Sequence, residues 1–228
     1  MTSAPLPPAM PRSLFVAGTD TGVGKTWVAT RLLAALTAAG HRAAGMKPVA
    51  AGAEWTSHGL RNDDALDLAA AGNVRLPYEW TNPVCLQRAT SPHLAAREEE
   101  TVIDLAAIQS AYSSIRSKAD IVIVEGAGGW LAPIADPPRA GETGPTMQDV
   151  AVTLGLPVVL VVGLRLGCLN HALLTAAAIR HSGLEFAGWI ANPVDPAFAD
   201  TDLYVDSLRL RMPGALLWTA PQVILPGQ

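Results

Sequence analysis

A glycine-rich stretch, Gly18–Thr26, carries the residues of this sequence that are best suited to bind phosphate. Glycines let backbone N–H groups approach phosphate oxygens closely, and a helix that begins at the end of the loop adds the positive end of its dipole. Lys25 supplies a cation for the outer phosphates, and the Thr26 hydroxyl is a ligand for Mg²⁺. The spacing is unusual, because five residues separate Gly18 from Gly24 where the common phosphate-binding loop has four. A chance glycine turn is the alternative, and the order of strand, loop and helix argues against it.

Two carboxylates and a second lysine have the chemistry to act beside this loop. Lys47 follows a short predicted strand; it can neutralise charge on a transferred phosphoryl group, or it only covers the surface at a strand end. Glu125 ends an apolar strand and precedes the small residues Gly126–Gly129, so it is a candidate Mg²⁺ ligand, or else an acid that faces solvent. Asp64 is a further candidate ligand, although the helix dipole alone also explains an acid in a first helical turn.

For three other residues we weigh a role in ligand binding or catalysis against a purely structural one. Trp27 follows the loop and is either a core residue or a wall beside a nucleotide. Asn192 precedes Pro193 and either hydrogen-bonds a purine edge or occupies a turn. Ser91 has no base partner that the sequence reveals, so no nucleophilic triad is predicted, and the histidines show no mutual spacing for a metal site.

These residues must be positioned by regular elements, and six segments are predicted as strands: Leu14–Ala17, Arg42–Met46, Ile121–Val124, Val158–Val162, Phe186–Ile190 and Ala215–Trp218. The predicted helices are Trp27–Leu36, a segment capped by Asn62, a short segment from Thr90, a segment capped by Thr101 that ends at Ile115, Thr146–Leu154, Ala172–Arg180 and Ala197–Arg211. Loops are expected over Val49–Arg61, Asn73–Pro92 (a candidate lid) and Pro133–Pro145.

The alternation of strands and helices predicts one α/β domain, with a mostly parallel sheet covered on both faces. In such a sheet, ligands bind at the carboxyl ends of the strands. The unusual segments all follow predicted strands: Gly18–Thr26, Lys47-Pro48, Glu125–Gly129, Gly167–Asn170, Asn192 and Thr219–Pro221. We therefore expect them to meet at one edge of the sheet.

Composition excludes several classes of function. Half of the 228 residues are apolar, 16% are charged and the formal net charge is −4, so neither nucleic acid nor a membrane is an expected partner. Residues 1–13 are Pro-rich and lack the features of a signal peptide; we interpret them as a disordered tail before a single domain of residues 14–228 in the cytoplasm. Cys85 and Cys168 suit reduced thiols in that compartment.

Several segments, taken in chain order, resemble the motifs of dethiobiotin synthetase, an ATP-dependent enzyme family of biotin biosynthesis. They are Gly18–Thr26, Ala44–Ala50, Gly59–Leu66, Thr90–His93, Val124–Trp130, Leu166–His171 and Ala187–Asn192. The longer glycine loop is the form that this family uses. The resemblance implies a three-layer, P-loop NTPase-like fold.

The resemblance also implies a reaction and its participants. CO₂ and 7,8-diaminopelargonate form a carbamate, ATP phosphorylates it to a carbamic-phosphoric anhydride, and ring closure gives dethiobiotin, ADP and phosphate. Mg²⁺ would be the cofactor, Lys47 and Lys25 the catalytic residues, and a homodimer would share each active site.

By position, the resemblance assigns Mg²⁺ to Thr26, Asp64 and Glu125. It assigns ATP to Gly22, Val23, Gly24, Lys25, Thr26, Trp27, Asp64, Glu125, Gly126, Ala127, Gly128, Asn192, Thr219, Ala220 and Pro221. It assigns the diamine to Thr21, Lys47, Ala51 and, from the other subunit, Gly167, Cys168, Leu169 and Asn170.

The sequence departs from the family pattern at three places. Ala51 stands where a hydroxyl residue is usual, Pro193 removes a backbone donor after Asn192, and the loop of residues 136–145 is unlike the family. The main alternative is a partition-type ATPase that acts as a nucleotide switch, but Asp20 stands where such proteins carry an additional lysine. The synthetase domain of a cobyrinate amidase, which would need a glutaminase domain, and a phosphate-binding scaffold for another small acid are the remaining alternatives.

Overall fold

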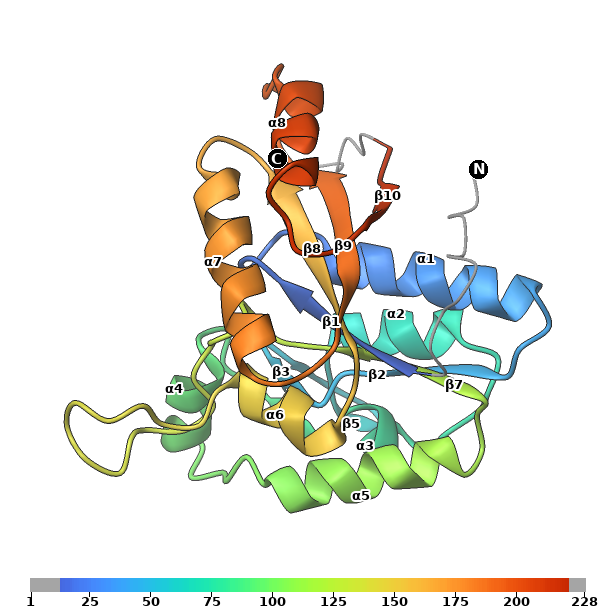
Figure 1. The fold of residues 1–228 in the computed structure, drawn as a ribbon. Helices are drawn as coiled ribbons and strands as arrows, with labels where there is room; N and C mark the ends of the chain where they lie inside the picture. Colours follow the sequence, from blue (N-terminus) through green and yellow to red (C-terminus); the bar gives the residue numbers. More distant parts are fainter. Residues whose placement is uncertain (1–12, 222–228) are drawn as a thin grey trace.

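The structure of the chain is a computed structural model that describes residues 13–221 (Figure 1). The tail predicted for residues 1–13 lies outside this range except for Ser13, which is the first residue of strand β1 (Ser13–Gly18). One sheet passes through the middle of the molecule, with helices on both of its sides (Figure 1). Within the described range, no helix is long and apolar enough to cross a membrane.

The central sheet has six strands in the order β10-β9-β8-β1-β7-β2, and every neighbouring pair is parallel. The other strands are β2 (Ala43–Met46), β7 (Ile121–Glu125), β8 (Val158–Leu164), β9 (Phe186–Pro193) and β10 (Leu216–Thr219). Parallel strands buried on both faces need apolar residues throughout, and β1, β7 and β8 are buried along their whole length. The predicted fold class is confirmed.

Alternate residues of each strand face the two helical layers. In β1, Leu14 and Val16 pack toward α1 (Lys25–Ala38) and α2 (Asp63–Ala71), whereas Phe15 and Ala17 belong to the larger core on the other face. That second face is covered by α5 (Leu105–Arg116), α6 (Met147–Leu154), α7 (Cys168–His181) and α8 (Thr201–Arg209). The sheet is thus the middle of three layers.

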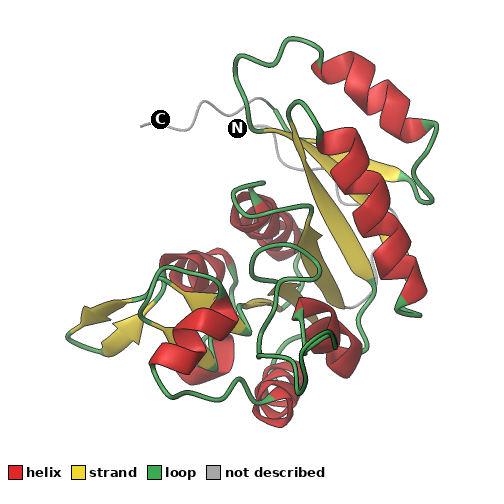
Figure 2. Cartoon of the chain, turned by 90° about the vertical axis from the view of Figure 1, so that its left-hand side faces the viewer, coloured by secondary structure: helices red, strands yellow, loops and turns green. Residues whose placement is uncertain are grey.

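The loops predicted over Val49–Arg61 and Asn73–Pro92 contain regular structure, so that prediction was wrong. Strand β3 (Val49–Ala51) pairs in parallel with β6 (Val84–Leu86), and β4 (Glu54–Thr56) forms a hairpin with β5 (Gly59–Arg61) that projects from the body at the lower left of Figure 2. A single helical turn, α3 (Tyr78–Thr81), precedes β6. Each of these elements has only three or four residues, which is too short for a periodic pattern to reveal.

Several boundaries also differ from the predicted ones. Helix α5 is capped by Asp104, whose carboxylate accepts the Ala106 N–H at 2.8 Å, and not by Thr101. Helix α7 begins at Cys168, four residues earlier than expected, because Gly167 adopts a left-handed conformation with φ 93°. Asn192 and Pro193 are the last residues of β9, so they do not form a turn, and α8 is shorter than Ala197–Arg211.

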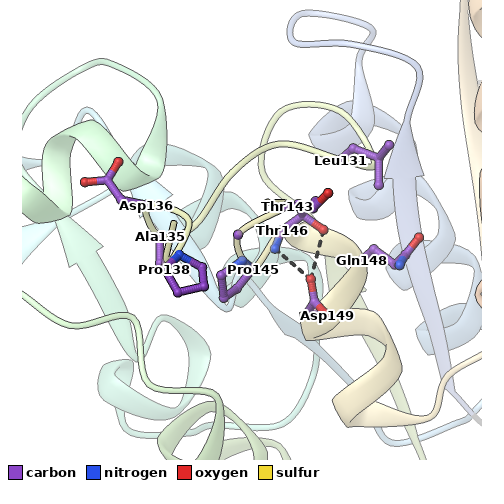
Figure 3. Close-up of a pocket in the computed structure, with 10 residues that line it drawn as sticks. Leu131, Ala135, Asp136, Pro138, Thr143, Pro145, Thr146, Gln148 and Asp149 are labelled. Carbon is purple, nitrogen blue, oxygen red and sulfur yellow. Dashed lines mark hydrogen bonds between the residues drawn. The ribbon is translucent and has the colours of Figure 1, made fainter. Parts of the chain in front are cut away.

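Three other cap and helix predictions are confirmed. Asn62 caps α2, and its side chain accepts the Ala65 N–H at 3.4 Å. The short helix α4 (Pro92–Glu98) begins after Ser91. Thr146 begins α6 in a capping box with Asp149. The two dashed lines in Figure 3 are the hydrogen bonds that Asp149 Oδ2 accepts from the N–H and from the hydroxyl of Thr146.

Candidate active site

The phosphate loop, Gly18–Thr26, joins the buried centre of the sheet to the start of α1. Its conformation depends on Gly24, which has φ 83° and lies against the Asn192 side chain. A Cβ atom on this glycine would lie 2.1 Å from Asn192 Nδ2, so any other residue would be strained at this φ and would displace the Asn192 amide. The same Nδ2 donates to the carbonyl oxygen of Val23 at 2.8 Å. Asn192, at the end of β9, therefore holds the loop in shape.

The lysine of this loop is held by backbone. Lys25 Nζ donates to the carbonyl oxygen of Asp20 at 2.9 Å, and the Asp20 carboxylate accepts the Thr21 N–H at 2.7 Å and pairs with Arg165 at 2.7 Å. Burial, and then the charge of Lys47, lower the pKa of Lys25 to about 8. A bound phosphate would reverse that effect by favouring the ammonium.

A second group of charges, which we call the Lys47 cluster (Lys47, Asp64, Glu125 and the Thr26 hydroxyl), lies beside the loop. The register of two strands brings Lys47 and Glu125 together. Met46, the last residue of β2, pairs with Val124 of β7, and the residues that follow them are Lys47 and Glu125. Lys47 Nζ is 2.5 Å from Glu125 Oε1 and 2.8 Å from Asp64 Oδ2. One ammonium thus bridges two carboxylates.

The hydroxyl of Thr26 joins this cluster to the phosphate loop. Thr26 Oγ1 lies 2.9 Å from Asp64 Oδ1 and 2.9 Å from Glu125 Oε1, and it can donate to one of them. Asp64 reaches the cluster from the first turn of α2, where the Asn62 cap fixes the start of the helix. Four residues that are far apart in sequence therefore meet within hydrogen-bonding distance.

Burial makes this cluster electrostatically strong. The Glu125 side chain is completely buried and that of Lys47 is 5% exposed. Burial opposes the Lys47 ammonium, but the charges of Glu125 and Asp64 outweigh it and raise the pKa of Lys47. Burial likewise opposes the charge of Asp64, and Lys47 outweighs it and lowers the pKa of that carboxyl. Complete burial raises the pKa of Glu125, so its charge depends on the neighbouring ammonium.

The cluster has the ligands that Mg²⁺ prefers. Asp64 and Glu125 offer carboxylate oxygens and Thr26 offers a hydroxyl oxygen, while Glu125 Oε2 is buried with no hydrogen-bond partner among the described residues. Over residues 13–221 there is no group of three or more His, Cys, Asp or Glu side chains suited to a metal. Two carboxylates and a hydroxyl beside a phosphate loop nevertheless fit Mg²⁺, because that ion takes its other ligands from phosphate and water.

A cleft of about 840 Å³ runs between the loop and the cluster. The predicted site residues that line it are Thr21, Gly22, Gly24, Lys25, Thr26, Trp27, Lys47, Ala51, Asp64, Glu125, Ala127 and Gly128. Val23 is buried beneath the loop, and Gly126 offers its carbonyl oxygen 3.4 Å from Lys47 Nζ. The remaining predicted residues are not in the lining: Asn192, Thr219, Ala220, Pro221, Gly167, Cys168, Leu169 and Asn170.

Trp27 fits both of its interpretations. It lines the cleft, and it also packs on the core beneath α1, where its ring stacks on that of Trp218 with centroids 5.3 Å apart and planes 12° apart. The guanidinium of Arg31 lies 5.1 Å from the Trp27 ring centroid. Because Trp218 directly precedes Thr219, this stack connects the phosphate loop to the end of β10.

Sequence reasoning missed several residues that shape the site. The pairing of Asp20 with Arg165 joins segments that are 145 residues apart, and no local pattern indicates it. Ser91, which lines the cleft, was expected to have no base partner, but its hydroxyl lies 3.0 Å from Nδ1 of His93. Tyr78 and Asn82, in the segment predicted as a loop, contact the backbone on either side of the cluster. The dipeptide Asn82-Pro83 was the one local signal of a fixed turn there.

A second hollow lies beside the Pro- and Gly-rich loop, between Leu131 and Asp149 (Figure 3). Both of its carboxylates are already engaged. Asp149 completes the capping box of α6, and Asp136 pairs with Arg97 at 3.3 Å. We therefore assign the chemistry to the cleft beside the phosphate loop.

The fold has known relatives. The chain is similar to the septum site-determining protein MinD of Pyrococcus horikoshii, solved with Mg-ADP, with a TM-score of 0.57 and 16% identity over 94% of this chain and 82% of that chain. At that level of identity the likeness concerns the fold alone, and it confirms the P-loop NTPase-like architecture. A family profile described as an AAA domain matches residues 12–213.

Two relatives are much more similar in sequence. The ATP-dependent dethiobiotin synthetase BioD of Aromatoleum aromaticum is 49% identical over 213 residues, which are 93% of this chain and 92% of the relative. The protein of the same name from Xanthomonas axonopodis pv. citri is 48% identical over 200 residues, which are 88% of this chain and 86% of the relative. Identity of this extent, together with the cleft described above, shows that the chain belongs to the ATP-dependent dethiobiotin synthetase family of enzymes.

Proposed function

We propose that this protein carboxylates 7,8-diaminopelargonate with CO₂ and closes the ring to give dethiobiotin, at the expense of one ATP. The observation that carries the proposal is the bridging lysine. Lys47 Nζ lies within 2.5 to 2.8 Å of Glu125 and Asp64, directly beside a phosphate loop. A cation next to bound phosphates is what transfer of a phosphoryl group to a small acid requires.

ATP binds with its phosphates on the loop. The backbone N–H groups of Gly22 to Trp27 and the Lys25 ammonium contact the phosphates, and the small residues of Glu125 to Gly128 allow the nucleotide to approach β7. Asn192 and Thr219 to Pro221 form the pocket for the base. The stack of Trp27 on Trp218 supports this arrangement, because it links the loop to the strand that ends at Thr219.

Thr26, Asp64 and Glu125 would hold Mg²⁺. When bound, the ion neutralises charge on the terminal phosphates of the nucleotide. In the structure the ammonium of Lys47 contacts the same two carboxylates. With Asp64 and Glu125 holding the ion, Lys47 would turn toward the substrate.

The chemistry needs no protein nucleophile. One amine of the diamine forms a carbamate with CO₂, and a carbamate oxygen attacks the γ-phosphorus of ATP, which releases ADP. The second amine then attacks the carbamate carbon, the C–N bond forms and the C–O bond to phosphate breaks. Lys47 contacts the carbamate and the transferring phosphoryl group, and Lys25 stabilises the charge on the phosphates.

The diamine lies near Thr21, Lys47 and Ala51 in the cleft, and its carboxylate tail binds the start of α7 in a second subunit. Gly167 to Asn170 supply N–H groups there, at the positive end of the helix dipole. Two observations support a homodimer. These residues do not line the cleft of their own chain, and the side chains of Leu166 and Leu174 beside them are 79% and 64% exposed. We expect the enzyme in the cytoplasm, where its co-substrate ATP is available.

One assay tests the proposal directly. The purified protein is incubated with ATP, Mg²⁺, bicarbonate and 7,8-diaminopelargonate, and dethiobiotin and phosphate are quantified by mass spectrometry and a phosphate assay. We expect one phosphate for each dethiobiotin. Hydrolysis of ATP without ring closure would reject this substrate assignment and favour the alternative of a nucleotide switch.

A further inference from the structure

The last residue of the helical turn α3 and the residue that follows it hydrogen-bond to the backbone of Lys47 on both sides. The N–H of Lys47 donates to the carbonyl oxygen of Thr81 at 2.7 Å, and the side chain Nδ2 of Asn82 donates to the carbonyl oxygen of Lys47 at 2.7 Å. The same Nδ2 lies 3.0 Å from the carbonyl oxygen of Val84. Thr81 and Asn82 are both buried, so water does not compete for these bonds. The backbone of Lys47 is consequently fixed at the point where β2 ends.

Tyr78 connects these hydrogen bonds to the side of the Lys47 cluster where Asp64 lies. Its hydroxyl donates to Oδ1 of Asn82 at 3.0 Å and accepts the N–H of Asn62 at 2.8 Å. Asn62 is the N-cap of α2, and Asp64 lies two residues further along that helix. One hydroxyl group therefore connects the backbone at Lys47 with the helix start that presents Asp64.

The tyrosine is itself held in place. The guanidinium of Arg61 lies 4.0 Å from the centroid of the Tyr78 ring, and the hydroxyl lies 3.7 Å from Sγ of Cys85. Burial raises the pKa of Tyr78 to about 12, so the hydroxyl keeps its proton and remains a donor at neutral pH. A phenol that donates once and accepts once satisfies both of its neighbours.

We propose that Tyr78 and Asn82 are positioning residues that set the separation of Lys47 and Asp64, and we call Tyr78, Asn82 and Asn62 the Tyr78 network. The inference rests on the proposed function, because it assigns these residues to the phosphoryl-transfer step. Of Lys47 and Asp64, Asn82 reaches Lys47, by its hydrogen bond to the Lys47 carbonyl oxygen. Tyr78 acts on both residues, through Asn82 and through Asn62. The Tyr78 network thus fixes the positions of Lys47, which would contact the substrate, and of Asp64, whose carboxylate suits Mg²⁺.

This branching gives the two variants different expected effects. In Asn82→Ala the carbonyl of Lys47 loses its donor, so we expect kcat to fall about 10- to 100-fold while the KM for ATP changes less than about twofold, because the phosphate loop is untouched. In Tyr78→Phe we expect a similar fall in kcat and, in addition, about a tenfold weaker affinity for the metal at Asp64. The kcat of the double variant should be little lower than that of Asn82→Ala, because Tyr78 acts on Lys47 in series through Asn82. Its metal affinity should match that of Tyr78→Phe, because the contact of Tyr78 with Asn62 bypasses Asn82.

The metal affinity is measured without turnover. Mn²⁺ is titrated by electron paramagnetic resonance into wild type, Asn82→Ala and Tyr78→Phe, each with ADP bound. Only Tyr78→Phe should bind Mn²⁺ more weakly. If Asn82→Ala does not fold, the isosteric Asn82→Asp replaces it, since an aspartate still accepts from Tyr78 but cannot donate to Lys47.

Two matched controls report on stability alone. Asn73→Ala removes an asparagine that also bridges backbone groups, at the start of β2 and away from the cleft, where it accepts from Ala43 N–H and donates to His41 O at 2.9 Å each. Tyr204→Phe removes a phenolic hydroxyl group from α8. We expect both variants to lower the melting temperature and nothing else. Their kcat and Mn²⁺ affinity should stay within about twofold of wild type.

Two results would overturn the inference. The first is a kcat in Asn82→Ala that falls only in proportion to the folded fraction, as measured by circular dichroism. The second is an unchanged Mn²⁺ affinity in Tyr78→Phe. If wild type forms no dethiobiotin, the proposed reaction fails instead, and the Mn²⁺ titration still decides whether the Tyr78 network positions Asp64.

Discussion

The phosphate loop and the Lys47 cluster line the same cleft but are built in different ways. The loop is one continuous stretch of nine residues, Gly18–Thr26, that offers backbone N–H groups, and its contacts depend on glycine conformation. The Lys47 cluster consists of charged side chains from segments that are 17 and 78 residues away from Lys47. A site made of backbone tolerates most side chains but no added Cβ at its tight points, whereas a site made of buried charges depends on every partner.

The largest effect is expected on the charged side, in Lys47→Ala. Loss of a cation that stabilises the transferring phosphoryl group should lower kcat by about 10²- to 10³-fold. Steady-state kinetics of dethiobiotin formation measure this, with Asn73→Ala as a control for general damage. A loss below about tenfold would mean that Lys47 is structural.

On the backbone side, Gly24→Ala should weaken ADP binding by about 10- to 100-fold. Alanine at φ 83° costs about 1–2 kcal/mol, and its Cβ would in addition displace the Asn192 amide. Gly40→Ala is the matched control, because Gly40 has φ 88° and open space around it, so only stability should fall. Calorimetric titration with ADP separates the two variants, and equal ADP affinities in both would show that the loop does not depend on Gly24.

The lysine of the loop should make nucleotide binding depend on pH. In the free protein the pKa of Lys25 is about 8, and bound phosphate favours the charged form, so the pKa is higher in the complex. The affinity for ADP is therefore highest below about pH 8. Above that pH it decreases by up to about tenfold for each pH unit, until the pH passes the pKa of Lys25 in the complex.

Titrations with ADP between about pH 7 and about pH 9.5 measure this dependence. Lys25→Arg is the control, because a guanidinium stays charged over the whole range. An affinity of the wild type that is as flat as that of Lys25→Arg would contradict the expected titration of Lys25.

The smallest effect is expected from Asn192→Ala, which leaves the residues of the loop unchanged but removes the hydrogen bond to the Val23 carbonyl that helps to hold the loop in shape. Loss of one hydrogen bond of about 1 kcal/mol should weaken ADP about fivefold, with kcat nearly unchanged. Asn192→Asp, which keeps the shape but not the donor, should behave in the same way. A loss as large as that of Gly24→Ala would mean that Asn192 contributes far more to nucleotide binding than this one hydrogen bond.

The same contrast explains what the sequence could predict. The loop, its strand and its helix are adjacent in the chain, so residue type and order were sufficient. Lys47 and Glu125 were predicted from strand ends, because parallel strands bring their carboxyl ends together. Asp64 was a candidate because Asn62 marks a helix start.

The residues that sequence reasoning missed depend on pairings that no local pattern contains. Strand β3 exists because Val49 pairs with Val84, 35 residues away, and that pairing puts Asn82 beside Lys47. A three-residue strand and a single helical turn carry too little periodicity to be recognised. The pairing of Asp20 with Arg165 is of the same kind, because it depends on β8 lying next to β1.

The bridge from Lys47 to Glu125 and Asp64 also has a consequence for the order of binding. The Lys47 ammonium is a monovalent counterion that the protein itself places between Glu125 and Asp64, so it offsets part of their charge. A divalent ion that enters alone must compete with that ammonium. One that arrives on a nucleotide gains phosphate ligands and gives Lys47 a new anionic partner. We therefore expect metal and nucleotide to bind cooperatively, each strengthening the affinity for the other by the same factor.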